Sequence, residues 1–508
     1  MNLGFSGSLG AGLSNHWNDR SDQSFDNPGL YYEKYETFNE NPFEKPTEAP
    51  LSTFSIDVDA AGYSNLRRFI NDGYIPSKDV VKLEEMINYF DYKWPQPKGE
   101  HPFSITTEYA NCPWNKKNRI LQVGIKGKNI AKENLPANNL VFLLDVSGSM
   151  NDANKLGLVK KGFKLLVDEM REEDYVSIVV YAGAAGEVLP PTSGAYKEKI
   201  LAALNNLNAG GSTAGGEGIE LAYKLAEKNF NKKGNNRIIL ATDGDFNVGM
   251  TGDDELVKLI EEKRETGIFL SVMGFGSGNL NNSMMEKVAD NGNGNYSYID
   301  NVMEAKKVFV TEMGATLYTI AKDVKLQLEF NPRYVESYRL LGYENRMLAP
   351  EDFDNDLKDA GELGAGHTVV ALYEIVPSDE GYKTTSSSLK YQTFMFSEAS
   401  KSDDLVTIKF RYKEPQGTKS KLITKVVRNY IPDAPSENMK FATSVAEFGL
   451  LMRESEYRAD ASYESLIERA KSSKGTDENG YRAEFIRLAE QGQLLFEDYI
   501  TNYRKMED

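Results

Sequence analysis

Apolar residues recur with two different spacings along the chain, and each spacing predicts a different kind of structure. Between residues 136 and 322, short apolar runs alternate with longer stretches in which apolar residues recur every three or four positions. This alternation predicts strands interleaved with helices, and therefore a doubly wound α/β domain whose mostly parallel sheet is covered on both faces. Strands are expected near residues 141, 175–181, 237–242, 268–273 and 296–299. Helices are expected at residues 154–170, 197–207, 219–230, 254–265, 284–290 and 305–317.

On both sides of this region the spacing changes to two, which is typical of strands that bury one face. The alternation occurs earlier at residues 103–109 and 119–126, and later at residues 324–330, 368–375 and 405–412. Two early strands are too few to form a stable sheet alone. We therefore expect them to complete a β-sandwich built mainly from the later strands, with the α/β domain inserted between the two groups.

The ends of the chain have a different character. Residues 1–50 are rich in Gly, Ser, Asn and Asp, which predicts an irregular leader. A strand at residues 53–59 and helices at 64–71 and 78–90 are expected to form a small α-rich segment. Near the C-terminus, helices are expected at residues 444–457, 463–472 and 481–499. The first of the C-terminal helices carries an apolar stripe, Val445, Phe448 and Met452, that we expect to pack into a core.

The predicted organisation of the chain therefore has six parts. The six parts are a leader (1–50), an α-rich segment (51–98), early strands (99–135), the α/β domain (136–322), the β-sandwich (323–432) and a helical region (433–508).

Composition narrows the classes of function. The 508 residues include 59 Lys and Arg against 76 Asp and Glu, a formal charge of −17, which argues against a nucleic-acid partner. With one cysteine and three histidines, neither an intrachain disulfide nor a His-built zinc site is expected. There is no membrane-spanning run of about 18 apolar residues. The N-terminal residues lack the features of a signal peptide, so we expect a cytoplasmic protein or a chain that starts after a removed export segment.

The strongest chemical signal follows the apolar run at residues 140–144. That run ends in Asp145, Ser147 and Ser149, with Gly148 allowing a sharp turn between the two hydroxyls. A buried strand would deliver these three oxygen-bearing side chains to one point at its carboxyl end. Mg²⁺ takes about six oxygen ligands and commonly keeps some waters, so these residues supply about half of a coordination shell.

Two later loops are expected at the same edge of the sheet. Thr213 lies in a glycine-rich loop before a predicted helix, and Asp243 ends a second buried strand. Together the five residues resemble the metal-ion-dependent adhesion site of the von Willebrand factor type A (vWA) domain, a Rossmann-like fold, whose pattern is D-x-S-x-S followed by a distant Thr and a distant Asp.

The resemblance implies how such a site works. It implies that Ser147, Ser149 and Thr213 contact the metal directly, while Asp145 and Asp243 act through waters. A cation held by few carboxylates stays electron-poor and accepts an Asp or Glu side chain of a protein partner. We therefore expect a non-enzymatic binding or adhesion protein that uses Mg²⁺, with Mn²⁺ and Ca²⁺ as alternatives; in a structural alternative the metal only braces the three loops.

The resemblance extends to the flanking regions. Residues 52–59, 63–69 and 84–90 resemble the N-terminal segment of one group of bacterial vWA proteins, and residues 342–346 with the helical tail resemble that group's C-terminal domain of unknown function. Members of the group are often predicted to be exported, some as lipoproteins, so the resemblance implies a location in the cell envelope. The present chain departs from that pattern, because it has no export signal and no N-terminal lipid-acceptor cysteine.

Two other functions fit parts of the sequence. vWA domains also accompany ATPases, so an accessory or assembly subunit is an alternative; this chain has no G-x-x-x-x-G-K-[ST] loop with which to hydrolyse ATP itself. Asp57 and Asp59 resemble the D-x-D-x-T motif of haloacid-dehalogenase-like phosphatases, although Ala61 replaces the threonine. The glycine-rich stretch 274–278 matches part of a phosphate loop, but we expect it to flank the metal site.

Overall fold

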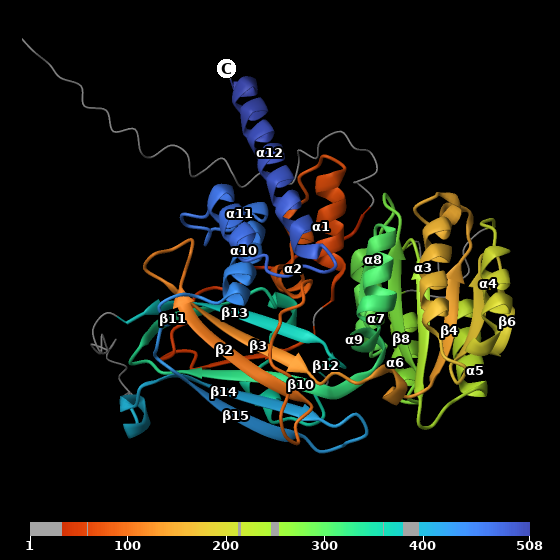
Figure 1. Cartoon of the computed structure of the whole chain (residues 1–508), viewed down its shortest axis with the longest axis horizontal. Coiled ribbons are helices and arrows are strands. Elements are labelled where there is room, and N and C mark those ends of the chain that lie inside the picture. The colour runs from red at the N-terminus through yellow and green to blue at the C-terminus, as the bar shows by residue number, and fades with distance from the viewer. Residues whose placement is uncertain are drawn as a thin grey trace, which may run out of the picture.

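The computed structural model describes residues 33–57, 59–211, 215–244, 253–358, 360–378 and 396–507. Figure 1 shows a six-stranded sheet with its helices at one end of the molecule, two antiparallel sheets at the other end, and a group of helices above them. In the six-stranded sheet the strand order is β6 (Ala185–Ser193), β5 (Tyr175–Tyr181), β4 (Asn138–Asp145), β7 (Asn235–Thr242), β8 (Phe269–Phe275) and β9 (Tyr296–Ile299). All neighbouring pairs are parallel except β5 and β6.

The central strand β4 is continuously apolar in sequence because it is buried on both faces. Leu140, Phe142 and Leu144 belong to one core cluster, whereas Val141 and Leu143 belong to another on the opposite face. The first face is covered by α3 (Leu156–Glu169), α4 (Lys197–Asn205) and α8 (Val302–Lys306). The second is covered by α5 (Gly215–Lys228), α6 (Asp253–Arg264) and α7 (Asn282–Asn291). A parallel strand buried on both sides needs an apolar residue at every position.

One expected helix of this region is present but interrupted. The helix predicted at residues 305–317 is divided into α8, a π-helical turn at Lys307–Thr311 and α9 (Met313–Leu317). The backbone N–H of Glu312 donates to the carbonyl of Lys307, five residues earlier, and the two side chains form an ion pair at 2.6 Å. The wider turn interrupts the regular helical bonding that the sequence pattern had suggested.

The other two sheets combine strands from distant parts of the chain. The order in one is β11 (Val335–Leu341), β13 (Thr368–Pro377), β3 (Arg119–Gly127) and β2 (Phe103–Asn111). In the other it is β1 (Leu51–Ser55), β10 (Thr319–Phe330), β14 (Asp404–Lys413) and β15 (Lys421–Arg428), with β12 (Gly361–Gly364) also paired to β10. The pairing of β3 with β13 joins residues that precede the six-stranded sheet to residues that follow it. The pairing of β1 with β10 brings the N-terminal strand into the second sheet, a contact that the sequence did not suggest.

A second core lies between the helices and the outer face of the β3–β13 pair. It is formed by α1 (Ala61–Asn71), α2 (Leu83–Asn88), α10 (Glu437–Met452), α11 (Tyr463–Ser472) and α12 (Tyr481–Glu507). Val445, Phe448 and Met452 are buried in this core, as their helical spacing predicts. The buried Arg67 of α1 forms ion pairs with Glu304 at 2.7 Å and with the partly exposed Glu484 at 2.9 Å, which tie the N-terminal helix to α8 and α12. In the described part of the chain, no helix is both long enough and apolar enough to cross a bilayer.

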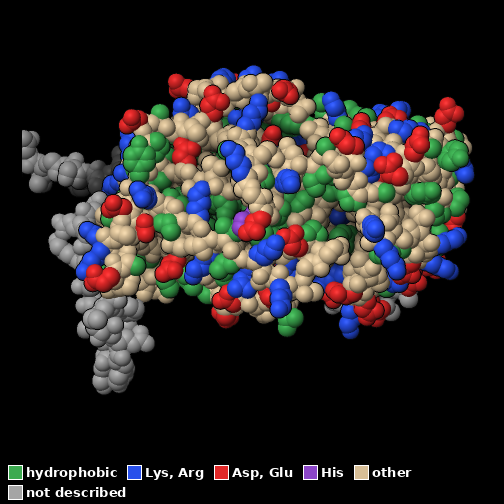
Figure 2. All heavy atoms as spheres, turned by 60° about the horizontal axis from the view of Figure 1, so that its bottom comes forward, with side chains coloured by type: hydrophobic (Ala, Val, Ile, Leu, Met, Phe, Trp, Pro, Cys, Tyr) green, Lys and Arg blue, Asp and Glu red, His purple; other side chains and the backbone are tan. Residues whose placement is uncertain are grey.

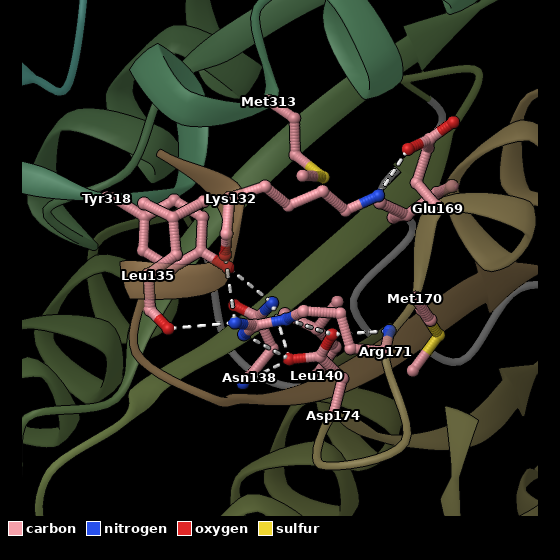
Figure 3. A pocket seen from close by; sticks show the side chains of 11 residues that line it. Lys132, Leu135, Asn138, Leu140, Glu169, Met170, Arg171, Asp174, Met313 and Tyr318 are labelled. Carbon is pink, nitrogen blue, oxygen red and sulfur yellow. Dashed lines mark hydrogen bonds and ion pairs between the residues drawn. The ribbon is translucent and has the colours of Figure 1, made fainter. Parts of the chain in front are cut away.

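The residues just before β4 lie next to Tyr318, which follows α9 (Figure 3). The chain therefore enters and leaves the six-stranded region at one place. The guanidinium of Arg171 donates to the carbonyl of Leu135 at 2.9 Å and to that of Pro136 at 2.8 Å, and it pairs with Asp174. Asn138, at the start of β4, donates to the hydroxyl of Tyr318 at 2.6 Å. The cavity among these residues measures only about 10 Å³, so this region is a structural junction rather than a ligand site.

Candidate metal centre

The D-x-S-x-S loop begins at the carboxyl end of β4 and is held by its neighbours. Asp145 is the last residue of β4 and is fully buried. The N–H of Val146 donates to the carbonyl of Tyr181 at 3.0 Å, and the N–H of Gly148 donates to that of Gly211 at 3.0 Å. The loop is therefore fixed both to β5 and to the glycine-rich loop that precedes α5.

Both carboxylate oxygens of Asp145 are engaged by the protein. The N–H of Ser147 donates to Oδ1 at 2.8 Å, and the hydroxyl of Thr242 donates to Oδ2 at 3.3 Å. Burial raises the pKa of Asp145 to about 6, although these hydrogen bonds oppose the rise. A carboxylate that is already bonded at both oxygens is suited to orient the loop and to act on a cation through water.

The two serine hydroxyls are spaced as two ligands of one small cation. Ser147 Oγ and Ser149 Oγ are hydrogen-bonded to each other in the structure and lie 3.0 Å apart. Two adjacent octahedral ligands at about 2.0–2.1 Å from Mg²⁺ would be about 2.9 Å apart. The donor set of hydroxyl and carboxylate oxygens is also the hard kind that Mg²⁺ prefers. The residues of this loop therefore fit a cation of this class.

Asp243 reaches the same edge of the sheet from the neighbouring strand. Leu144 of β4 is paired with Ala241 of β7, so the two parallel strands end side by side. The side chain of Asp243 is fully buried and forms an ion pair with Lys155 at 3.0 Å between Oδ2 and Nζ. Burial alone would raise the pKa of Asp243, but the positive charge of Lys155 and hydrogen bonds from Lys155, Ser149 and Asn279 bring it below the ordinary value.

The structure thus brings together four of the five predicted site residues: Asp145, Ser147, Ser149 and Asp243. The fifth, Thr213, lies outside the described residues, and so do Asp245 and Asn247, which follow Asp243. Among the residues that are described, no group of three or more His, Cys, Asp or Glu side chains could hold a metal. The predicted site itself contains two carboxylates, Asp145 and Asp243, and three hydroxyls.

Thr242, Lys155 and Asn279 belong to the site and escaped the sequence interpretation. Thr242 is adjacent to Asp243 in the chain, and its hydroxyl bridges to Asp145 on the next strand. Lys155 follows the D-x-S-x-S loop and is the first lysine or arginine after it, which is the only signal in the sequence for its role.

The pair Asp57 and Asp59 occupies a different place. Asp57 lines a cleft of about 460 Å³ beside the base of the six-stranded sheet. Arg346 forms ion pairs with Asp57 at 3.1 Å, with Asp59 at 3.4 Å and with Asp290 at 2.8 Å. Asp59 also accepts a hydrogen bond from the backbone N–H of Tyr296 at 2.8 Å. These contacts give both aspartates a structural role in neutralising a largely buried arginine.

Figure 2 shows how charged side chains are distributed on one face of the molecule. On the face drawn in Figure 2, basic and acidic side chains are interspersed, and no broad area of positive charge is seen. A nucleic-acid partner would require such an area on the surface that it contacts.

The fold and the site define the class of protein. Residues 139–311 match the family model for the von Willebrand factor type A domain, and residues 30–122 match a second one described as von Willebrand factor. Residues 315–495 match a family model described as "Uncharacterized protein YfbK, C-terminal". This is a vWA-domain protein, as the five-residue pattern suggested.

The particular family follows from the full-length comparison. The chain is 45% identical over 472 residues to "Uncharacterized protein YfbK" of Escherichia coli, which spans 91% of this chain and 81% of that protein. The chain belongs to the YfbK family of bacterial vWA proteins. A protein of Synechocystis, sll0103, is 30% identical over 231 residues, covering 44% of this chain and 52% of its own length.

Solved structures are similar to parts of the molecule. The BatB protein of Bacteroides thetaiotaomicron is 25% identical, with 35% of this chain and 97% of that chain covered and a TM-score of 0.31. A von Willebrand factor type A protein of Catenulispora acidiphila is 15% identical, with coverages of 87% and 89% and a TM-score of 0.39.

Proposed function

We propose that this protein binds a protein partner through a divalent cation held at the carboxyl end of β4. Ser147, Ser149 and Thr213 are the proposed direct ligands, and Asp145 and Asp243 act through waters. The partner supplies an Asp or Glu carboxylate to the metal. The proposal requires no catalytic step, and Mg²⁺ is the proposed ion, with Mn²⁺ and Ca²⁺ as alternatives.

One observation carries this proposal. The hydroxyls of Ser147 and Ser149 lie 3.0 Å apart, while both oxygens of Asp145 are already bonded within the protein. Hydroxyl ligands are neutral, so they leave a bound dication with most of its charge. Such an ion attracts an additional anionic oxygen more strongly than one that several carboxylates already neutralise.

The architecture supports the same function. We propose that the vWA domain spans residues 136–322 and is inserted into a β-sandwich. Ligands of open α/β sheets bind beyond the carboxyl ends of the strands. A location in the cell envelope, which the family resemblance implies, remains a prediction.

A direct Mg²⁺ titration tests the site. Isothermal titration calorimetry on the wild type is expected to give one site per chain, and Ser147→Ala with Ser149→Ala is expected to remove the binding. Ser465→Ala, on the exposed surface of α11, is the matched control and should bind as the wild type does. Equal Mg²⁺ binding by the double variant and the control would refute the assignment of the ligands.

Capture experiments test the partner. Immobilised wild-type protein should retain a partner in Mg²⁺ and release it in EDTA, and the double serine variant should retain none. A partner that stays bound in EDTA, and binds the variant equally, would argue against recognition through a metal.

A further inference from the structure

A lysine is built into the candidate metal centre. The ammonium of Lys155 lies 3.0 Å from Asp243 Oδ2 and 3.3 Å from Asn279 Oδ1. The side chain of Lys155 is 7% exposed and that of Asp243 is fully buried. A buried charge pair of this kind is fixed in place, because either charge alone would be costly to keep away from water.

The glycine-rich loop after β8 is shaped around this lysine. Gly276 has a positive φ of 78°, and a Cβ atom at this position would overlap the Cε atom of Lys155. The same loop supplies Asn279, the second acceptor of the ammonium. The stretch at 274–278, which matches part of a phosphate loop in sequence, thus provides the space through which the lysine reaches Asp243.

We propose that Lys155 weakens the binding of the metal when no partner is present, and that it makes metal binding depend on an acidic ligand. This inference rests on the proposed function. Asp145, Asp243 and Lys155 together carry one net negative charge, so a bound dication leaves the centre with one net positive charge. A single carboxylate from a partner makes the centre neutral. Without Lys155, the dication alone would neutralise the two aspartates.

The charge balance has two consequences of opposite sign. Removing the charge of Lys155 eliminates its repulsion of the dication, so the affinity for Mg²⁺ rises. The same change makes the loaded centre neutral, so it attracts a carboxylate less. A lysine with only a structural role would give a different result, because its loss would weaken both kinds of binding by loosening the site.

The test uses the full chain and measures Mg²⁺ affinity by thermal shift, with Mg²⁺ titrated in chloride and in acetate at equal ionic strength. Acetate is the carboxylate probe. Lys155→Gln removes the charge and keeps a hydrogen-bond donor for Asp243, and Lys155→Met is a second neutral variant. Lys161→Met removes the same charge from an exposed position on α3 and is the matched control. Circular dichroism verifies that each variant is folded.

The wild type and Lys161→Met are expected to bind Mg²⁺ more tightly in acetate than in chloride. Lys155→Gln is expected to bind Mg²⁺ about tenfold more tightly in chloride and to gain less from acetate than the wild type does. Equal or weaker Mg²⁺ binding by both Lys155 variants, or an unchanged effect of acetate, would overturn the inference. No Mg²⁺ binding by any of the proteins would instead overturn the proposed function, and the inference with it.

Discussion

Replacing Asp145 by asparagine should stabilise the metal-free protein while removing its response to Mg²⁺. The amide keeps an oxygen that accepts from the N–H of Ser147, and its NH₂ group can donate to the hydroxyl of Thr242, which now serves as acceptor. The geometry of the loop is therefore preserved, and the principal change is the loss of a buried negative charge.

The expected magnitude follows from the pKa of Asp145. Burial raises this pKa from 3.8 to about 6. A difference of about 2 units corresponds to about 3 kcal/mol of destabilisation of the folded state at neutral pH. Asp145→Asn in EDTA at pH 7.5 should therefore unfold at a higher temperature, by about 6–12 °C at most for a domain of this size.

The pH dependence has a definite sign. Because burial raises the folded-state pKa of Asp145, this group does not destabilise the metal-free wild type below pH 3.8. The free energy of unfolding falls as the pH rises through about 6 and the buried carboxyl ionises. The advantage of Asp145→Asn in EDTA should therefore shrink as the pH is lowered from 7.5 towards 4. In Mg²⁺ at about 100 times Kd, the wild type should gain about 2.7 kcal/mol and the variant nothing.

Thermal unfolding in EDTA and in Mg²⁺, at several pH values, measures all of these effects. The reasoning would be refuted by a variant that is less stable than the wild type in EDTA at pH 7.5, or by one that retains the full stabilisation by Mg²⁺.

Three further changes test other parts of the account. Glu374→Ala removes the 2.9 Å ion pair of the buried Arg339 and leaves it the longer contact with Glu40 at 3.6 Å, so the free energy of unfolding in urea should fall by about 3–5 kcal/mol. An unchanged value would contradict the buried pair. Gly364→Ala places a Cβ atom over a backbone oxygen of α9 and should lower the free energy of unfolding by about 1–3 kcal/mol. Gly157→Ala, where a Cβ atom meets open space, is the control and should be neutral or stabilising. Equal thermal midpoints for the two variants would contradict this contrast. Thr213→Ala should weaken Mg²⁺ binding in a calorimetric titration, and unchanged affinity would remove Thr213 from the ligand set.

The α/β sheet was the most predictable part of the fold, because its central strands are buried on both faces. A continuous apolar run such as residues 140–144 fits a strand that is buried on both faces. Strand β6 was missed because it lies at the sheet edge, where most of its residues are only partly buried or exposed, and because it includes Pro190 and Pro191. Strand β12 was missed because it has four residues, two of them glycine.

The antiparallel strands were only partly recognisable. β15 lies at the edge of its sheet and exposes Leu422 and Val426, so its apolar residues do not mark a buried face. The strand near residues 53–59 was predicted, but its partner β10 lies more than 260 residues later. Local patterning cannot identify a partner at that distance, because it records which face is buried and not what covers it.

The candidate site was predictable where its residues lie at strand ends and unpredictable where they come from other loops. The spacing of Asp145, Ser147 and Ser149 on one loop, and the position of Asp243 after a second buried strand, were sufficient to place them together. The part played by Lys155 depends on Gly276 and the loop after β8, which meet it only in the folded chain. The D-x-S-x-S pattern therefore does not reveal the positive charge that Lys155 brings to the site.

The most direct test of the central claim is to locate the metal. Crystals grown or soaked with Mn²⁺ should show one anomalous difference peak per chain at the carboxyl end of β4, about 2.1–2.2 Å from the Oγ atoms of both Ser147 and Ser149. A peak elsewhere in the molecule, or no peak at a Mn²⁺ concentration that saturates binding in solution, would contradict the account.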